Sequence, residues 1–201
     1  MNREALVYAA SGLLFGLLVG WVIGSQRGPV SPFGVAPPVA ATALATQPQA
    51  PPPLDQARVQ ALESAAAGSP TDPSPRIELG NLLFDAERYA DAIRWYEEAL
   101  KLDPKNPNLS TDLGVSYYYT NQPDRALQQF DVSLAIDPVH TKTLLNRGIV
   151  RAFGKQDLKG AIESWEEIVR LAPESPEGRA AKQALDNMRA AHPDVGALTD
   201  K

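Results

Sequence analysis

Two patterns of apolar residues divide the chain. Residues 5–24, ALVYAASGLLFGLLVGWVIG, form one unbroken run without a charged side chain. After residue 53, apolar and small residues are interleaved with charged ones, and a similar arrangement returns about every 34 residues. Positions three and four residues apart share one face of an α-helix. This part is therefore predicted to be all-α, with helices near 54–67, 75–86, 89–102, 108–120, 123–136, 141–153, 158–171 and 176–191.

The uncharged run has the length of a membrane-spanning helix. About 20 helical residues cross the roughly 30 Å core of a bilayer, and residues 5–24 match that length. Tyr8 and Trp21 lie near its two ends, where amphipathic rings favour the boundary between lipid and water. A cleaved signal peptide is the alternative, but its apolar region typically has about 7–15 residues. We therefore expect residues 1–27 to be a retained, single-pass signal-anchor.

Glycines spaced four residues apart lie on one stripe of this predicted membrane helix: Gly12, Gly16, Gly20 and Gly24. Small residues let two membrane helices approach closely, which favours packing against a second copy or against a partner's helix. Glycine is also common in membrane spans, which is the simpler interpretation. The flanking charges favour a cytoplasmic N-terminus by a single positive group, so in a bacterium the C-terminal domain is expected in the periplasm. The opposite orientation stays open.

Residues 28–53 separate the anchor from the folded part. They contain eight of the 18 prolines and no charged residue, a composition that favours an extended polyproline II chain. At about 3.1 Å per residue, such a spacer reaches up to roughly 80 Å. Residues 54–201 hold 17 basic and 23 acidic residues, a net charge of −6. They are expected to fold as one domain.

Composition argues against several functions. The chain has no cysteine, which excludes a disulfide framework, a zinc ribbon and a thiolate nucleophile, and its net charge of −5 argues against nucleic-acid binding. Neither His140 nor His192 belongs to a metal-ligand spacing or has a serine or cysteine partner in a known motif. A glycine-rich phosphate loop is missing as well. We therefore expect no enzymatic activity, no metal and no cofactor.

A 34-residue repeat organises the folded part. Prolines recur at positions 70, 104, 138 and 173, and glycines at positions 80, 114 and 148. A small residue also precedes a ring by four positions in each repeat, as Ala92/Tyr96, Ala126/Phe130 and Ala161/Trp165. With Leu79-Gly80-x-x-Leu83 and Leu113-Gly114-x-x-Tyr117, this pattern resembles the tetratricopeptide repeat (TPR) family.

The resemblance implies a right-handed α-solenoid of three helix pairs with a capping helix at each end. The repeats would cover 73–106, 107–140 and 141–175, the caps 54–67 and 176–191, and a flexible tail 192–201. Glycine and alanine would let the two helices of one repeat pack closely. Repeat three departs from the pattern, because Arg147 and Arg151 occupy positions where leucine and tyrosine are usual. Its one extra residue is expected in the turn between Gly154 and Gly160.

The family presents its ligand groove along the first helix of each repeat. Carried onto this chain, that geometry implies a peptide-binding surface made of Ile77, Asn81, Phe84, Asp85, Thr111, Val115, Tyr118, Tyr119, Lys142, Leu145, Ile149 and Phe153. Some family members clamp the carboxylates of an acidic tail with lysine, arginine and asparagine. The corresponding positions here are Ile77, Asn81, Val115, Lys142 and Asn146, of which only Asn81 and Lys142 match, so such a clamp is not expected.

The sequence thus predicts a membrane-anchored bacterial adaptor that binds a peptide or helix of another protein. The stretch Ala161–Pro173 is also similar to membrane-anchored assembly factors, including those of c-type cytochrome maturation, which favours a role in assembling an envelope complex. The alternative is a scaffold that self-associates through the glycine stripe and through stacking of repeat arrays, with a homodimer as its simplest form.

Overall fold

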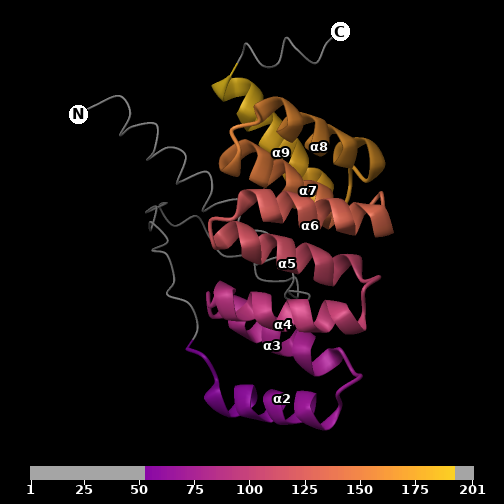
Figure 1. Cartoon of the computed structure of the whole chain (residues 1–201). Helices are drawn as coiled ribbons and strands as arrows, with labels where there is room; N and C mark the ends of the chain where they lie inside the picture. The colour runs from indigo at the N-terminus through magenta and orange to yellow at the C-terminus, as the bar shows by residue number, and fades with distance from the viewer. Residues whose placement is uncertain (1–52, 193–201) are drawn as a thin grey trace, which may run out of the picture. The chain divides into compact units, whose positions relative to one another are not determined.

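The computed structural model describes residues 53–192, which form eight α-helices and one π-helix (Figure 1). In chain order these are α2 (Gln56–Gly68), α3 (Ser74–Asp85), α4 (Tyr89–Leu102), α5 (Pro107–Tyr119), α6 (Pro123–Ile136), α7 (Thr141–Ile149), η1 (Val150–Gly154), α8 (Leu158–Leu171) and α9 (Pro176–Ala191). The predicted helices are confirmed to within two residues at either end, except that α7 and η1 divide the predicted helix 141–153.

The predicted anchor, its glycine stripe, nearly all of the predicted linker and most of the predicted tail lie outside the described residues. Within residues 53–192, no helix combines the length and the hydropathy that crossing a bilayer requires.

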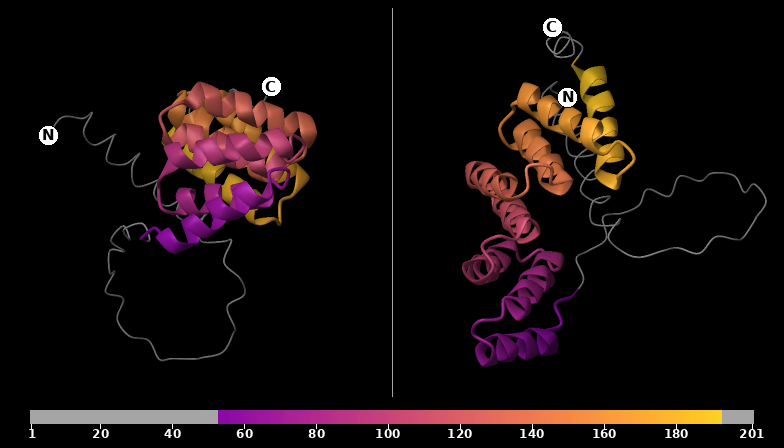
Figure 2. Two further views of the ribbon diagram at one scale, coloured as in Figure 1. Left: turned by 60° about the horizontal axis from the view of Figure 1, so that its bottom comes forward. Right: turned by 90° about the vertical axis from the view of Figure 1, so that its right-hand side faces the viewer.

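The described helices form pairs that stack one on the next (Figure 1, Figure 2). α3 packs against α4, α5 against α6 and α7 against α8, and we call these pairs repeats one, two and three, each with a helix A and a helix B. Helix A of repeat two, α5, contacts helix A of repeat three, α7, and α7 contacts the C-terminal cap helix α9. No comparable contact joins α4 to α6 or α6 to α8 in the described part. Helices A therefore line the inner face of a curved stack.

Close packing within each repeat depends on the glycine of helix A. A Cβ atom at Gly80 would lie 2.3 Å from the ring of Tyr96, and one at Gly114 would lie 2.5 Å from the ring of Phe130. In repeat three, a Cβ at Gly148 would lie 2.2 Å from the Trp165 indole nitrogen. Each ring thus occupies the space that a side chain would need. The packing role predicted for these glycines is confirmed.

The terminal helices cover the two ends of the stack. α2 buries Ala66 against its neighbours and is otherwise mostly exposed. α9 buries one complete face against repeat three, which consists of Gly178, Ala180, Ala181, Ala184, Leu185 and Met188. Both helices therefore keep a polar outer surface where the stack ends, as solenoid caps require.

The extra residue of repeat three lies in η1, which continues helix A, and not in the following turn, which corrects the expectation for Gly154–Gly160. Each turn after helix A holds one residue with positive φ, at Glu87, Asn121 and Gln156. Asn121 and Gln156 are 35 positions apart, whereas Gly114 and Gly148 are 34 apart. The insertion therefore falls between Gly148 and Gln156, where η1 replaces α-helix. A π-helix accommodates one additional residue within a helical stretch.

The glycine contact can be tested by substitution at Gly114. We expect Gly114→Ala to lower the free energy of unfolding by about 1–3 kcal/mol, because the new methyl group would overlap the ring of Phe130. Urea unfolding of the solubilised full chain, followed by circular dichroism, measures this change. Gly68→Ala is the matched control, since no atom lies within 4 Å of its new Cβ. That variant should be unchanged or up to about 1 kcal/mol more stable. Equal losses in both variants would contradict the packing argument.

Candidate functional site

Three of the predicted groove residues are buried in the interior. The exposed fraction is 0% for Thr111, 1% for Leu145 and 5% for Ile149. Thr111 faces the neighbouring helices α6 and α7, and the Leu145 carbonyl accepts a hydrogen bond from the Trp165 indole nitrogen. Their assignment to a peptide-contacting surface is corrected, because α5 and α7 pack on each other and α7 also packs on α8 and α9, which leaves these side chains buried.

The other nine predicted residues keep some exposed surface. Asn81 and Asp85 of α3 are exposed. The remaining seven are half-buried, namely Ile77, Phe84, Val115, Tyr118, Tyr119, Lys142 and Phe153. Of the nine, Phe84, Tyr118, Tyr119 and Phe153 are aromatic and lie toward the C-terminal ends of the first helices of the repeats, and Asn81, Asp85 and Lys142 are polar. Ile77 and Val115 pack against the buried core.

An aromatic row runs between repeats one and two and consists of Phe84, Tyr89, Tyr118 and Tyr119. The rings of Tyr89 and Tyr119 are stacked, with centroids 4.4 Å apart and an interplanar angle of 10°. Phe84 contacts both of them edge-on, at 5.1 Å and 5.8 Å. Tyr118 lies 6.0 Å from Tyr119. Such geometries are favourable beyond the area they bury, so the row is an ordered apolar surface.

The row also extends toward repeat three. A Cβ atom at Gly154 would lie 3.1 Å from the Tyr118 ring, which places Tyr118 against the end of η1. Burial raises the pKa of Tyr89 to about 12, with a further contribution from the charge of Glu87. It also raises the pKa of Tyr118 and Tyr119. The tyrosines are therefore neutral at physiological pH, and their hydroxyls can donate and accept hydrogen bonds.

Tyr89 was not among the predicted site residues. It opens helix B of repeat one, and the family geometry directs attention to helices A alone. The signal that could have found it is its position five residues after Phe84, across the short turn between the two helices of the repeat.

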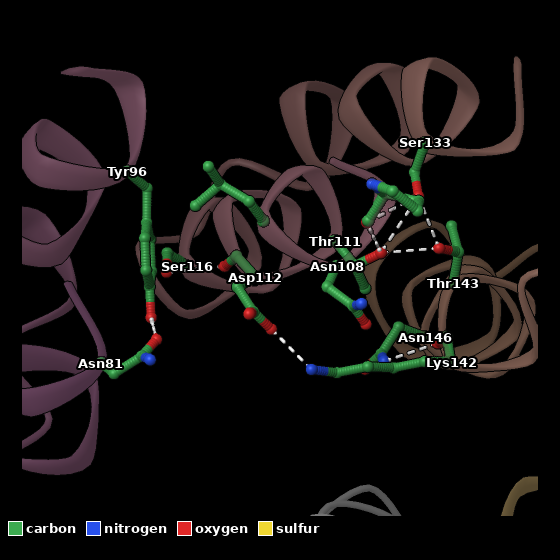
Figure 3. A network of polar contacts seen from close by, with 12 residues as sticks. Asn81, Tyr96, Asn108, Thr111, Asp112, Ser116, Ser133, Lys142, Thr143 and Asn146 are labelled. Carbon is green, nitrogen blue, oxygen red and sulfur yellow. Dashed lines mark hydrogen bonds and ion pairs between the residues drawn. The ribbon is translucent and has the colours of Figure 1, made fainter. Parts of the chain in front are cut away.

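Polar residues on the inner face are engaged with one another (Figure 3). The Lys142 ammonium forms an ion pair of 2.7 Å with the Asp112 carboxylate, which links α7 to α5, and about a quarter of each side chain is exposed. The Tyr96 hydroxyl donates a 2.8 Å hydrogen bond to the Asn81 amide oxygen. Asn146 is buried and donates to the Lys142 carbonyl. Asn81 and Lys142, the two positions that match a carboxylate clamp, are thus both bonded within the chain.

A buried hydroxyl cluster joins repeats two and three and consists of Thr111, Ser133 and Thr143. Their hydroxyl oxygens are 2.6 Å apart for Thr111 and Thr143, 2.8 Å for Ser133 and Thr143, and 3.1 Å for Thr111 and Ser133. Thr111 and Ser133 also donate to the Pro107 carbonyl. His140 closes the cluster from the side, with Nδ1 2.6 Å from the Thr143 hydroxyl. Polar contacts between side-chain hydroxyls therefore contribute to this junction in addition to apolar packing.

Arg147 lies where repeats one and two have the buried leucines Leu79 and Leu113. Its guanidinium makes long ion pairs to Asp131 of α6, at 3.8 Å, and Glu167 of α8, at 3.9 Å. Its Nε atom is buried without a hydrogen-bond partner. Burial lowers the pKa of Arg147, and the charge of Arg151 lowers it further. The departure of repeat three from the repeat pattern thus places a partly desolvated cation between helices B.

No set of three or more histidine, cysteine, aspartate or glutamate side chains within residues 53–192 is arranged to hold a metal ion.

The fold and the repeat spacing agree with known proteins. Residues 80–121 match the family model described as TPR repeat. The helix pairs are similar to tetratricopeptide repeats. The solved structure "First TPR of Spaghetti (RPAP3) bound to HSP90 peptide SRMEEVD" is similar with a TM-score of 0.55 and 27% identity, over 61% of this chain and 94% of that one. MamA from Desulfovibrio magneticus RS-1 is similar in fold, with a TM-score of 0.60 at 24% identity over 69% of this chain and 76% of that one.

Curated relatives are similar to this chain over part of its length. The heat-shock protein cognate co-chaperone sgt12 of Aspergillus fumigatus is 29% identical over 131 residues, which cover 65% of this chain and 37% of that protein. RNA polymerase II-associated protein 3 of Mus musculus is 28% identical over 127 residues, which cover 61% of this chain and 19% of that protein. The chain therefore spans well under half the length of these relatives.

The free energy of unfolding is expected to depend on pH because His140, which contacts the hydroxyl cluster, titrates. Burial lowers the pKa of His140 below its ordinary value of 6.5, against the opposing charges of Asp137, Asp112 and Glu177. The unfolded chain therefore binds more protons than the folded one as pH falls through 6.5, and the contribution of neutral His140 to stability is lost. We expect the free energy of unfolding to fall between pH 7.5 and pH 5.5, and to fall less in His140→Asn. Urea titrations of both proteins measure the slopes, and parallel pH profiles would contradict this assignment.

Proposed function

We propose that the TPR array is an adaptor module that binds a segment of another protein on its inner face, with the aromatic row as the main contact. The observation that carries the proposal is the row itself. Its rings come from α3, α4 and α5, stack on one another and keep part of their surface exposed. Aromatic residues in such settings dominate binding energies at protein interfaces, and helical arrays use their concave side for binding.

A related array supports peptide binding in particular. The RPAP3 array, which is 27% identical to this chain, was solved with a bound HSP90 peptide. That peptide, SRMEEVD, is acidic. In the present chain the Asp112 carboxylate already pairs with Lys142 on the inner face. We therefore propose a different ligand, held mainly through apolar anchors in the aromatic row.

We further propose that residues 1–27 anchor this adaptor in a membrane and that it serves the assembly of an envelope complex. The support is the uncharged run 5–24 followed by a proline-rich spacer. In the predicted orientation the array lies in the periplasm of a bacterium. The glycine stripe of the anchor then offers a second contact, either with a partner's membrane helix or with another copy of this chain.

Affinity capture with a defective variant tests the adaptor. We expect the tagged full chain, used on solubilised membranes, to retain a partner that Tyr118→Glu loses, because a carboxylate inserted beside Tyr119 and Gly154 disrupts the aromatic row. Val132→Glu is the matched control, since Val132 lies on α6 and is 48% exposed. Retained proteins are identified by mass spectrometry.

Circular dichroism should show the same helical content in all three proteins. If Tyr118→Glu unfolds the array, Tyr118→Ala removes the ring without adding charge and takes its place. Equal retention by the wild type and a folded Tyr118 variant would contradict the site. Retention of nothing but further copies of the chain would overturn the adaptor and indicate the self-associating scaffold.

A further inference from the structure

Two carboxylates border the aromatic row without an ion-pair partner. Asp85 follows Phe84 at the end of α3, and Glu87 lies in the turn that leads to Tyr89. Both are exposed, and no ion pair joins either of them to another residue of the described part. The nearest cation in sequence is Arg88, and its guanidinium is already held by Asp91, with the Arg88 Nε 2.7 Å from the carboxylate. The row therefore lies beside uncompensated negative charge.

These charges act on the hydroxyls of the inner face. The negative charge of Glu87 contributes to the raised pKa of Tyr89 and of Tyr119, after the larger effect of burial. The charges of Asp85 and Asp112 do the same at Tyr96, whose hydroxyl bonds Asn81. Asp85 directly follows Phe84 in the chain, and Glu87 lies two residues before Tyr89, so both exposed carboxylates lie next to residues of the aromatic row.

The one cation predicted for this surface does not offset that charge. Lys142 is paired with Asp112 at 2.7 Å, so that pair is neutral as a unit. Asp85 and Glu87 remain, and a ligand that approaches the rings meets a surface with negative charge and apolar character together. Ring faces attract cations through their quadrupole, and carboxylates form charge-assisted hydrogen bonds with ammonium or guanidinium groups.

We infer that the segment bound on the aromatic row carries a cationic side chain, arginine or lysine, between apolar residues, and that Asp85 and Glu87 receive this cation. The inference rests on the proposed function, because it specifies the ligand of the same site. The apolar residues of the segment pack on Phe84 and Tyr119, and the cation reaches the carboxylates at the edge of the row. An acidic segment is repelled at the same place.

A peptide library separates the charge of the ligand from the existence of the site. The immobilised full chain is incubated with nonapeptides whose central residue is arginine, glutamine or glutamate and whose flanking positions are mixtures of leucine, isoleucine, valine and phenylalanine. Retained peptides are counted by mass spectrometry. We expect arginine-centred peptides to be enriched about tenfold over glutamine-centred ones at low salt, and this preference to shrink as salt is added.

The double variant Asp85→Asn/Glu87→Gln should reduce that preference to about twofold or less while it still retains apolar peptides. Glu163→Gln/Glu174→Gln is the matched control, because both side chains are exposed and lie on or after α8. It removes the same net charge and should keep the full preference for arginine. If both double variants lose the preference for arginine-centred peptides equally, the preference depends only on the net charge of the protein, and the inference is overturned.

Two further outcomes keep the inference distinct from the proposed function. If the wild type retains glutamine-centred and arginine-centred peptides to the same extent, and Tyr118→Glu loses both, the peptide site is supported but the inferred cationic ligand is overturned. If the wild type retains no class of peptide above the level of Tyr118→Glu, the proposed peptide site itself fails.

Discussion

The contact between one glycine and one ring in each repeat sets the geometry on which the rest depends. Because Gly80, Gly114 and Gly148 have no Cβ, helix A and helix B approach until Tyr96, Phe130 or Trp165 fills the gap. That close approach fixes the crossing of the pair, and repetition of the pair produces the curved stack. The inner face, with its aromatic and polar residues, exists because three such pairs are arranged alike.

The fold could be predicted because the residues that determine it recur at one spacing. A glycine in the first helix, an aromatic residue in the second helix and a proline after it return about every 34 positions, so each repeat supports the interpretation of the others. The residues of the site were harder to predict from the sequence. Thr111, Leu145 and Ile149 occupy positions that line a groove in the family, yet here they are buried. Their burial depends on how closely α5 and α7 pack against each other and against α8 and α9, and the sequence of a single helix does not reveal those distances.

Two further features could not be predicted from the repeat pattern. The 35-residue interval could be counted from the sequence, but both a turn and a helix can accept one more residue, so its location in η1 required the structure. Tyr89 was missed for a related reason, since its stacking partner Tyr119 belongs to another repeat. Contacts between repeats are made by residues about 30 positions apart, which no local period reports.

The hydroxyl cluster also has a mechanical consequence. Apolar junctions resist separation but tolerate small rotations, because dispersion contacts have little directional preference, whereas hydrogen bonds lose strength steeply when their angles change. Thr111, Ser133 and Thr143 therefore give the junction of repeats two and three torsional stiffness. Tyr118 lies close to Gly154 across the same junction, so this stiffness restricts changes of curvature at the end of the aromatic row. A surface fixed in this way loses less conformational entropy when it is occupied.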